Sequence, residues 1–357
     1  MSKRRVALGL AMVAAGAVVG AAAEKFLSRR FIPRPAGESI APPSGEEAVV
    51  ESFDGTQIAL VAAGRTDGPA LVFVHGIIES SAIWHYQMAD SVLADRYRLV
   101  AYDARGHGRS GPARGPHGTT PFTTASQARD LVTVLEHATT GPVVLVGHSM
   151  GGMAIQALWD GDTADGVRGR IAGAALLNTT YTAELAGWRG RGSPVERAFE
   201  RVEDVVQRMI GSERLVSRLR PGRGSDLAML AARFVYGLKP RPEHLAASVR
   251  IYDQTPSATI AAAPDLATAD LLQTLAHIDV PVLVIAGTRD QITPMWLSEE
   301  IAARVANGEL AVLEDCGHMA PFERHEEVGA LIANFAASVL AEPSNTGGRG
   351  LTQENVL

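Results

Sequence analysis

The sequence predicts an α/β fold, in which a mostly parallel sheet carries helices on both faces. Between about residues 48 and 177, short apolar runs typical of buried strands alternate with segments of helical character. Two further apolar runs, at residues 282–286 and 310–313, extend this pattern toward the carboxyl terminus. A chain of 357 residues with 46% hydrophobic residues is long enough for one large domain with an insertion.

The first element is an apolar segment at residues 1–30, which we interpret as a membrane anchor or signal segment. Residues 6–23 carry no charge, and basic residues flank them on both sides. As a helix this run would be about 27 Å long, close to the ~30 Å hydrocarbon core of a bilayer. We therefore expect association with a membrane through an N-terminal single-pass helix. Secretion after cleavage of a signal peptide is the alternative, because the basic start and apolar run also fit that layout.

Residues 31–47 form the second element, a predicted extended linker. Its stiffness is expected from four prolines, Pro33, Pro35, Pro42 and Pro43. The first part of the α/β core follows at 48–180, and we expect it to open with a hairpin at 48–62 that turns at Asp54 and Gly55. The polar residues 342–357 are predicted to form a disordered tail.

The most informative motif is Gly-His-Ser-Met-Gly at residues 147–151. It follows the apolar run 143–146 and precedes a predicted helix at 152–159. A serine on a tight turn between strand and helix projects its hydroxyl clear of the backbone, and the flanking glycines let the turn close. The helix directs its free N–H groups toward the place where an oxyanion would form. Ser149 is therefore a candidate nucleophile, and an ordinary helix N-cap is the alternative.

Candidate partners for Ser149 follow two later strands. Asp290 lies just beyond the run 282–286, and His318 lies just beyond the run 310–313. Ligand sites of parallel sheets gather at the carboxyl ends of the strands, so both side chains are expected near the serine. A hydroxyl becomes a good nucleophile when a base takes its proton and an acid orients that base. We assign His318 as general base and then acid, and Asp290 as its orienting carboxylate.

Other residues compete for these roles. His75, His107 and His148 are alternative bases, but their positions favour structural roles, and His148 adjoins the serine on a strained turn. Asp315 is the alternative acid, although its closeness in sequence to the histidine at 318 constrains its approach.

With these residues in place, the chain closely resembles the α/β-hydrolase superfamily over residues 48–340. The resemblance is greatest to the esterase, monoacylglycerol-lipase-like and cofactor-free haloperoxidase-like branches. It rests on four blocks: His75-Gly76-Ile77-Ile78, Asp-Ala-Arg-Gly-His-Gly-Arg-Ser at 103–110, the serine turn, and Gly-His-Met-Ala-Pro at 317–321.

The resemblance implies further site residues. In such relatives the oxyanion hole is formed by backbone N–H groups of the residue after the nucleophile and the residue after His-Gly. Here these are Met150 and Ile77. The loops around the site are expected to be supported by His75, Gly76, Asp103, Gly147, His148 and Gly151.

Between residues 181 and 266 the sequence changes from strand to helical character. Apolar residues recur at helical spacing, as in Val202, Val205, Val206 and Met209. In relatives a helical cap occupies this place, so we predict a cap at 181–266 and the second part of the core at 267–341. A cap would give an acyl chain an apolar pocket and exclude water during attack. A peripheral helical decoration is the alternative.

Composition and motifs exclude several classes of function. The net charge of −6 argues against a nucleic-acid surface. The single cysteine, Cys316, allows no intramolecular disulfide. No His-Glu-x-x-His, Cys/His cluster or phosphate-binding Gly-x-x-x-x-Gly-Lys occurs in the sequence, so neither a metal nor another cofactor is expected. No pattern specifies an oligomeric state.

The resemblance implies a serine hydrolase that cleaves carboxylic esters through an acyl-enzyme. Its expected substrate is a small-molecule or lipid ester, including acylglycerols. Relatives that open epoxides or displace halide carry an aspartate where this chain has Ser149, so those reactions are disfavoured. The alternatives are carbon–carbon bond hydrolysis or cofactor-free perhydrolysis by the same triad, and a non-catalytic ligand-binding protein on this fold.

Overall fold

The computed structural model describes a large part of the chain, from residue 40 to residue 341. The described residues are 40–161, 164, 166–182, 212–219, 233, 235–238 and 240–341. The predicted apolar segment 1–30 and the predicted tail 342–357 lie outside them, as do parts of the predicted linker and cap.

The predicted membrane helix requires a correction. In the part of the chain that the structure describes, no helix is both long and apolar enough to cross a bilayer. This finding contradicts the membrane association and the localisation that we predicted from the apolar run. The segment 1–30 itself is not among the described residues.

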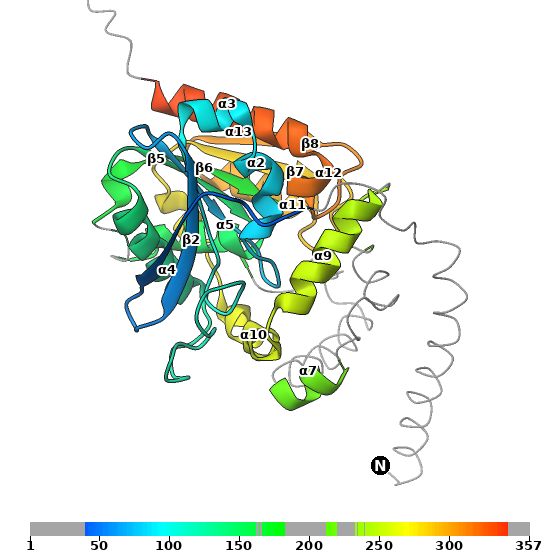
Figure 1. Ribbon diagram of the computed structural model, residues 1–357. Coiled ribbons are helices and arrows are strands. Elements are labelled where there is room, and N and C mark those ends of the chain that lie inside the picture. The colour runs from blue at the N-terminus through cyan, green and yellow to red at the C-terminus, as the bar shows by residue number, and fades with distance from the viewer. Residues whose placement is uncertain are drawn as a thin grey trace, which may run out of the picture.

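The core of the protein is a sheet of eight strands in the order β1-β2-β4-β3-β5-β6-β7-β8 (Figure 1). Strand β2 runs antiparallel to both of its neighbours, and the strands from β4 to β8 run parallel, as the sequence predicts. The strands are β1 (Glu46–Glu51), β2 (Gln57–Gly64), β3 (Ala70–Val74), β4 (Arg98–Tyr102), β5 (Val143–His148), β6 (Ile171–Leu177), β7 (Val282–Gly287) and β8 (Gly308–Leu313).

The predicted hairpin is present at the start of the sheet. Glu51 pairs with Gln57, which leaves the turn around Asp54 and Gly55. Gly55 has φ +85°, a conformation that glycine adopts without steric cost.

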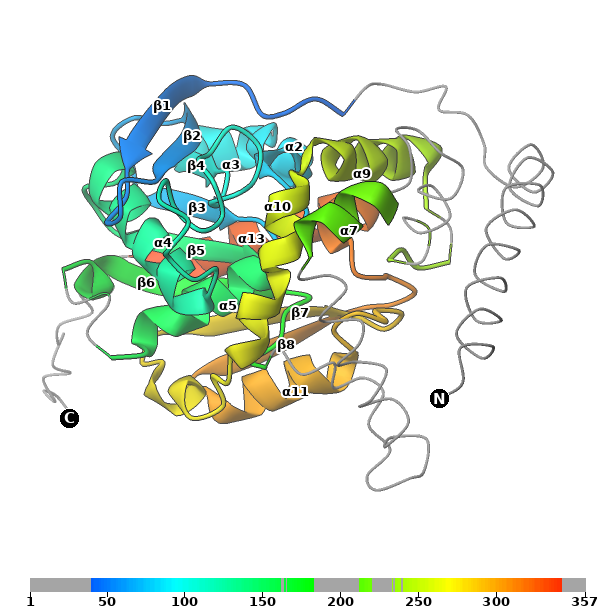
Figure 2. The same ribbon diagram turned by 90° about the horizontal axis from the view of Figure 1, so that it is seen from below.

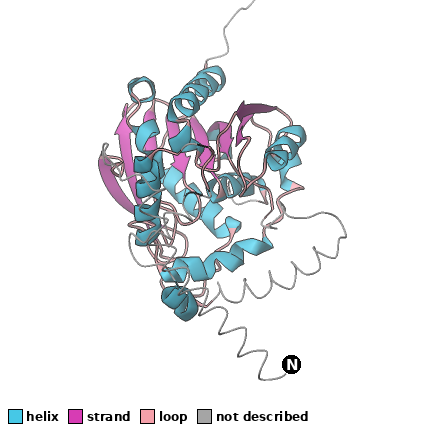
Figure 3. Ribbon diagram, turned by 90° about the vertical axis from the view of Figure 1, so that its right-hand side faces the viewer, coloured by secondary structure: helices cyan, strands magenta, loops and turns pink. Residues whose placement is uncertain are grey.

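Helices cover both faces of the sheet (Figure 3). In β3 and its neighbours, alternate residues point to opposite faces, and both sets are buried. This explains why the parallel strands have continuous apolar sequences. The helices are α2 (His85–Met88), α3 (Ser91–Arg96), α4 (Thr124–Ala138), α5 (Met150–Gln156), α7 (Glu213–Leu219), α9 (Pro242–Gln254), α10 (Ser257–Ala262), α11 (Met295–Arg304), α12 (Ala320–Glu323) and α13 (His325–Leu340).

The two faces have separate apolar cores. Side chains of α4, α5 and α11 pack with Val72 and Leu145 on one face. Side chains of α2, α3, α12 and α13 pack with Phe73 and Val144 on the other. Val72 and Phe73 are neighbours in sequence, as are Val144 and Leu145. Each of these strands therefore contributes side chains to both cores.

Helices α7, α9 and α10 belong to the segment that we predicted as a cap. Figure 2 shows them gathered outside the sheet, and α7 packs against α10. Helix α9 lines the same cavity as Ser149, which follows the carboxyl end of β5. The described part of the insertion therefore contributes to the wall of this cavity.

Candidate active site

Ser149 occupies a sharp turn between β5 and α5. Its backbone has φ 52° and ψ −121°, a conformation that non-glycine residues rarely adopt. The turn is held from the neighbouring strand: the N–H of Ser149 donates to the carbonyl of Leu177 at 3.0 Å, and the hydroxyl of Thr179 donates to the carbonyl of Ser149 at 2.6 Å. A strained backbone fixed in this way keeps the serine hydroxyl at the edge of the sheet.

The two glycines of the motif are required by close packing. A Cβ added at Gly147 would lie 2.6 Å from a methyl group of Ile155 and 2.8 Å from the backbone of Gly151. A Cβ added at Gly151 would collide with the backbone carbonyl of Val74 in β3. Helix α5 therefore approaches the sheet more closely than any side chain at these positions would allow.

His318 and Asp290 are joined by a hydrogen bond. Nδ1 of His318 lies 2.8 Å from Oδ2 of Asp290. Two further groups donate to the same oxygen, the side-chain amide of Asn178 at 2.8 Å and the hydroxyl of Thr293 at 2.7 Å. The other oxygen, Oδ1, accepts from the backbone N–H groups of Ile292 at 2.8 Å and Thr293 at 2.9 Å.

These donors keep Asp290 ionised. Burial alone would raise the pKa of this carboxyl, but the attraction of His318 and the hydrogen bonds from His318 and Thr293 outweigh it and lower the pKa to about 2. At neutral pH Asp290 is a buried anion that accepts the Nδ1 proton of His318, which leaves Nε2 of that ring as the nitrogen able to accept a proton.

The competing acid, Asp315, lies on the surface. Its side chain is 59% exposed and forms an ion pair with Arg289 at 3.2 Å. The described hydrogen bonds thus join His318 to Asp290 and leave Asp315 in a surface ion pair.

His75 and His107 hold the loops that follow β3 and β4. Nε2 of His75 accepts from the N–H of Ala104 at 2.9 Å, and Nε2 of His107 accepts from the N–H of Ile78 at 3.0 Å. In each ring Nδ1 faces a backbone carbonyl, to which it can only donate. Both rings are therefore neutral, and burial lowers the pKa of His107 to about 3.

Asp103 connects the same two loops. Its carboxylate accepts from the backbone N–H of Ser81 at 2.8 Å and from that of Arg109 at 3.0 Å. Both oxygens are occupied by these backbone groups, as expected of a residue that supports loops.

The predicted oxyanion donors are Met150, which follows Ser149 in the chain, and Ile77, which lines the same cavity. Met150 is the first residue of α5, where backbone N–H groups have no acceptor within the helix. Ile77 lines the cavity that Ser149 also lines. Because His107 accepts from the N–H of Ile78, the next N–H along the chain is engaged elsewhere.

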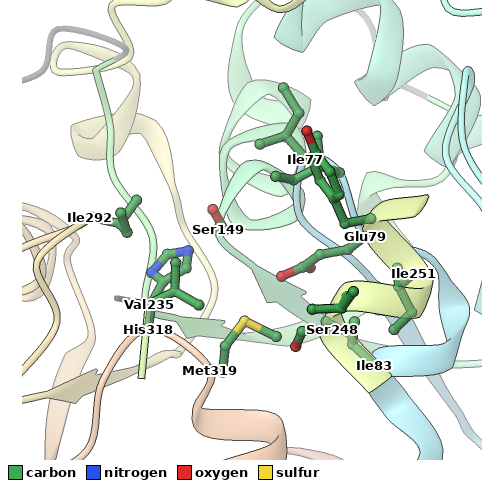
Figure 4. Close-up of a pocket in the computed structure, with 13 residues that line it drawn as sticks. Ile77, Glu79, Ile83, Ser149, Val235, Ser248, Ile251, Ile292, His318 and Met319 are labelled. Carbon is green, nitrogen blue, oxygen red and sulfur yellow. The ribbon is translucent and has the colours of Figure 1, made fainter. Parts of the chain in front are cut away.

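Ser149 and His318 open into one cavity of about 300 Å³ (Figure 4). Most of its described lining is apolar, and the polar residues Glu79, Ser248 and Tyr252 interrupt it. Helix α9 contributes part of the cavity wall. The apolar lining residues are Ile77, Ile78, Ile83, Val235, Val249, Ile251, Ile292 and Met319.

Three residues that support the site were not predicted from the sequence: Asn178, Thr293 and Glu79. Asn178 directly follows β6, so its position at a carboxyl strand end was a usable signal. Thr293 lies three residues after Asp290, a spacing typical of an Asx-type turn. Glu79 belongs to no strand or helix, and no pattern in the sequence indicates its role.

The described residues contain no group of three or more histidines, cysteines, aspartates or glutamates arranged to hold a metal ion. Cys316 is buried next to the site, and burial raises the pKa of its thiol. A buried thiol of raised pKa is a poor nucleophile at neutral pH.

Comparison with known proteins identifies the family. Residues 71–331 match the family model described as the alpha/beta hydrolase family. The chain belongs to this family. Its mostly parallel sheet and the serine turn after β5 agree with the fold that the sequence predicts.

Several relatives in the family have assigned activities. The chain is 27% identical over 282 residues to BpoC, a proposed non-heme bromoperoxidase of Mycobacterium tuberculosis, covering 77% of this chain and 96% of that protein. It is 26% identical over 293 residues to 3-oxoadipate enol-lactonase 1 of Acinetobacter baylyi, covering 82% and 97%. A thermophilic esterase from Thermogutta terrifontis is 25% identical with a TM-score of 0.64, covering 83% and 100%. These similarities support hydrolase activity.

Proposed function

We propose that the protein is a serine hydrolase that cleaves carboxylic esters through an acyl-enzyme on Ser149. The observation that carries the proposal is one cavity lined by both Ser149 and His318, with His318 bonded to the ionised Asp290 at 2.8 Å. The esterase and enol-lactonase among the relatives support the same class of bond, because a lactone is a cyclic ester.

The proposed reaction has two halves. Nε2 of His318 takes the proton of Ser149, and the alkoxide attacks the ester carbonyl. The backbone N–H groups of Ile77 and Met150 stabilise the oxyanion, and His318 then protonates the leaving alcohol. In the second half His318 activates water, which hydrolyses the acyl-enzyme and restores the free serine.

The cavity favours an acyl group of short or medium length. Its described lining is mostly aliphatic, and its volume of about 300 Å³ is at the small end of ligand pockets. Ile78 and Ile292 line the cavity and remain 37% and 45% exposed, so they form its mouth.

Hydrolysis of a p-nitrophenyl ester series from acetate to palmitate tests the proposal. We expect hydrolysis with an optimum below palmitate, and a loss of several orders of magnitude in kcat for Ser149→Ala. Ser298→Ala is the matched control, because Ser298 is a serine of α11 that lies outside the cavity. Ester hydrolysis that survives in Ser149→Ala would refute the mechanism.

A further inference from the structure

The cavity contains a carboxylate that the proposed mechanism does not use. Glu79 follows β3, lines the same cavity as Ser149 and His318, and is only 8% exposed. Figure 4 shows its side chain directed into this otherwise mostly apolar space. An ionised group is costly to bury unless other groups compensate its charge.

One carboxylate oxygen of Glu79 has two hydrogen-bond partners within the protein. Oε2 accepts from the backbone N–H of Gly76 at 2.5 Å and lies 3.0 Å from Nδ1 of His148. Gly76 separates this oxygen from the nucleophile: a Cβ added there would lie 2.7 Å from Oε2 and 2.9 Å from Cβ of Ser149. Only Gly76 therefore lies between the Glu79 carboxylate and the side chain of Ser149.

His148 supplies the positive charge that balances Glu79. Nε2 of His148 lies 2.8 Å from the carbonyl oxygen of His318, which can only accept, so Nε2 carries a proton. Nδ1 faces the carboxylate, so a second proton lies between this nitrogen and Glu79. Burial would raise the pKa of Glu79, but the attraction of His148 and its hydrogen bond lower it, and the pair exists as imidazolium and carboxylate.

The second oxygen of Glu79 is available to a ligand. Among the described residues, both hydrogen bonds of the carboxylate go to Oε2, and Oε1 has no partner. A charged acceptor in a small apolar cavity forms strong hydrogen bonds and loses stability when it stays unpaired. It also repels a second anion at short range.

We propose that Oε1 of Glu79 binds a hydrogen-bond donor on the acyl chain of the substrate, close to the scissile carbonyl. The proposal rests on the proposed ester hydrolysis and names its substrate class: esters or lactones whose acyl part carries a hydroxyl, amide N–H or ammonium group. Acyl groups that end in a carboxylate are disfavoured. Glu79 is then the residue that determines specificity, and His148 is the residue that positions it.

Three p-nitrophenyl esters of similar length test this assignment: butanoate, 3-hydroxybutanoate and hemisuccinate. Each kcat/KM is divided by the rate of alkaline hydrolysis of the same ester, which removes differences in intrinsic reactivity. For the wild type we expect 3-hydroxybutanoate to exceed butanoate by roughly tenfold to a hundredfold, since a hydrogen bond to a charged group discriminates on this scale. The hemisuccinate is expected to be the poorest of the three.

Glu79→Gln assigns the preference to this side chain. The amide oxygen would take the place of Oε2, because the backbone N–H of Gly76 donates there, and the NH₂ group would face the cavity. We expect the hydroxyl preference to fall severalfold, because the hydroxyl loses its charged acceptor and can only accept from the neutral NH₂ group, and the hemisuccinate to improve relative to butanoate. Ratios measured within one enzyme are independent of how much variant is folded.

The outcomes separate the role of Glu79 from ester hydrolysis itself. A wild-type ratio near one would refute the proposal even if Glu79→Gln does not fold, and a preference that is undiminished in Glu79→Gln would place the recognition elsewhere. Butanoate hydrolysis that depends on Ser149 but shows no hydroxyl preference would refute this inference alone. Absence of any hydrolysis that depends on Ser149 would refute the proposed function itself.

Discussion

At the scale of single residues, Asp290 is the most constrained group of the site. Five donors surround its two oxygens: His318, Asn178 and Thr293 side chains on Oδ2, and two backbone N–H groups on Oδ1. An asparagine has one oxygen and one NH₂ group. Whichever way it turned, its NH₂ would face at least two donors, so an isosteric change removes either the partner of His318 or the anchor of the turn at 290–293.

Asp290→Asn is therefore expected to lower kcat for ester hydrolysis by roughly a thousandfold to ten-thousandfold, with a much smaller change in KM. The reason is that His318 loses the acceptor for its Nδ1 proton and with it the tautomer that can accept at Nε2. Steady-state kinetics with p-nitrophenyl butanoate measure the effect. Asp315→Asn is the control, because Asp315 is a surface carboxylate, and equal losses in both variants would contradict the assignment.

At the scale of elements, the site depends on how closely α5 approaches the sheet. Gly151 lies in the first turn of α5, against the backbone of Val74 in β3. The same helix follows Ser149 and presents the N–H of Met150. The contact between α5 and β3 thus positions both the nucleophile and a proposed oxyanion donor, and a small side chain at 151 would move them together.

Gly151→Ala is expected to lower the free energy of unfolding by about 2–3 kcal/mol, because the atoms that the new Cβ meets belong to the backbone and cannot rotate away. Urea unfolding measures the change. Gly141→Ala is the matched control, since no atom lies within 4 Å of a Cβ added at Gly141, and its effect should stay within about 0.5 kcal/mol. Equal stabilities for the two variants would show that α5 can shift away from β3.

At the scale of the whole molecule, the Glu79–His148 pair joins segments that are far apart in sequence. Glu79 follows β3, His148 ends β5, and its Nε2 donates to the carbonyl of His318 beyond β8. The pKa of His148 is raised, since the effects of Glu79 and of the hydrogen bonds outweigh the lowering by burial. A raised folded pKa stabilises the protein fully below the unfolded value of about 6.5, and this stabilisation is lost as pH rises through the folded pKa.

We therefore expect the stability of the wild type, relative to the neutral double variant Glu79→Gln/His148→Gln, to decrease as the pH is raised from 7. Urea unfolding at several pH values measures this difference. His107→Gln is the control: His107, with its pKa of about 3, is neutral throughout this range in the folded state, so its difference from the wild type should stay flat. A flat difference for the double variant as well would contradict a His148 that is charged at pH 7 and loses its proton as the pH rises.

The strands could be predicted from the sequence, because parallel strands buried on both faces are continuous apolar runs. The edge of the sheet that carries the site could be predicted from where these runs end. β6 ends at Leu177, where the predicted alternation of strands and helices ends, and β5 and β7 extend one or two residues beyond their apolar runs. Ser149, Asp290 and His318 could be placed because each follows such a strand.

Other parts of the site depend on contacts that have no local sequence signal. Glu79 and His148 are 69 residues apart, and only the folded chain brings them together. The contribution of α9 to the cavity likewise follows from tertiary packing. The membrane prediction was wrong because it rested on apolar character alone, and no helix in the described chain meets the requirement for a span.

Direct detection of the acyl-enzyme tests the central claim. The protein is mixed with p-nitrophenyl butanoate, quenched in acid within the first turnover, and digested for mass spectrometry, with Ser149→Ala treated in parallel. We predict a burst of p-nitrophenolate and a butanoyl adduct on the peptide that contains Ser149, with neither in the variant. Turnover without an adduct on Ser149, or an adduct on another residue that persists in Ser149→Ala, would contradict the account.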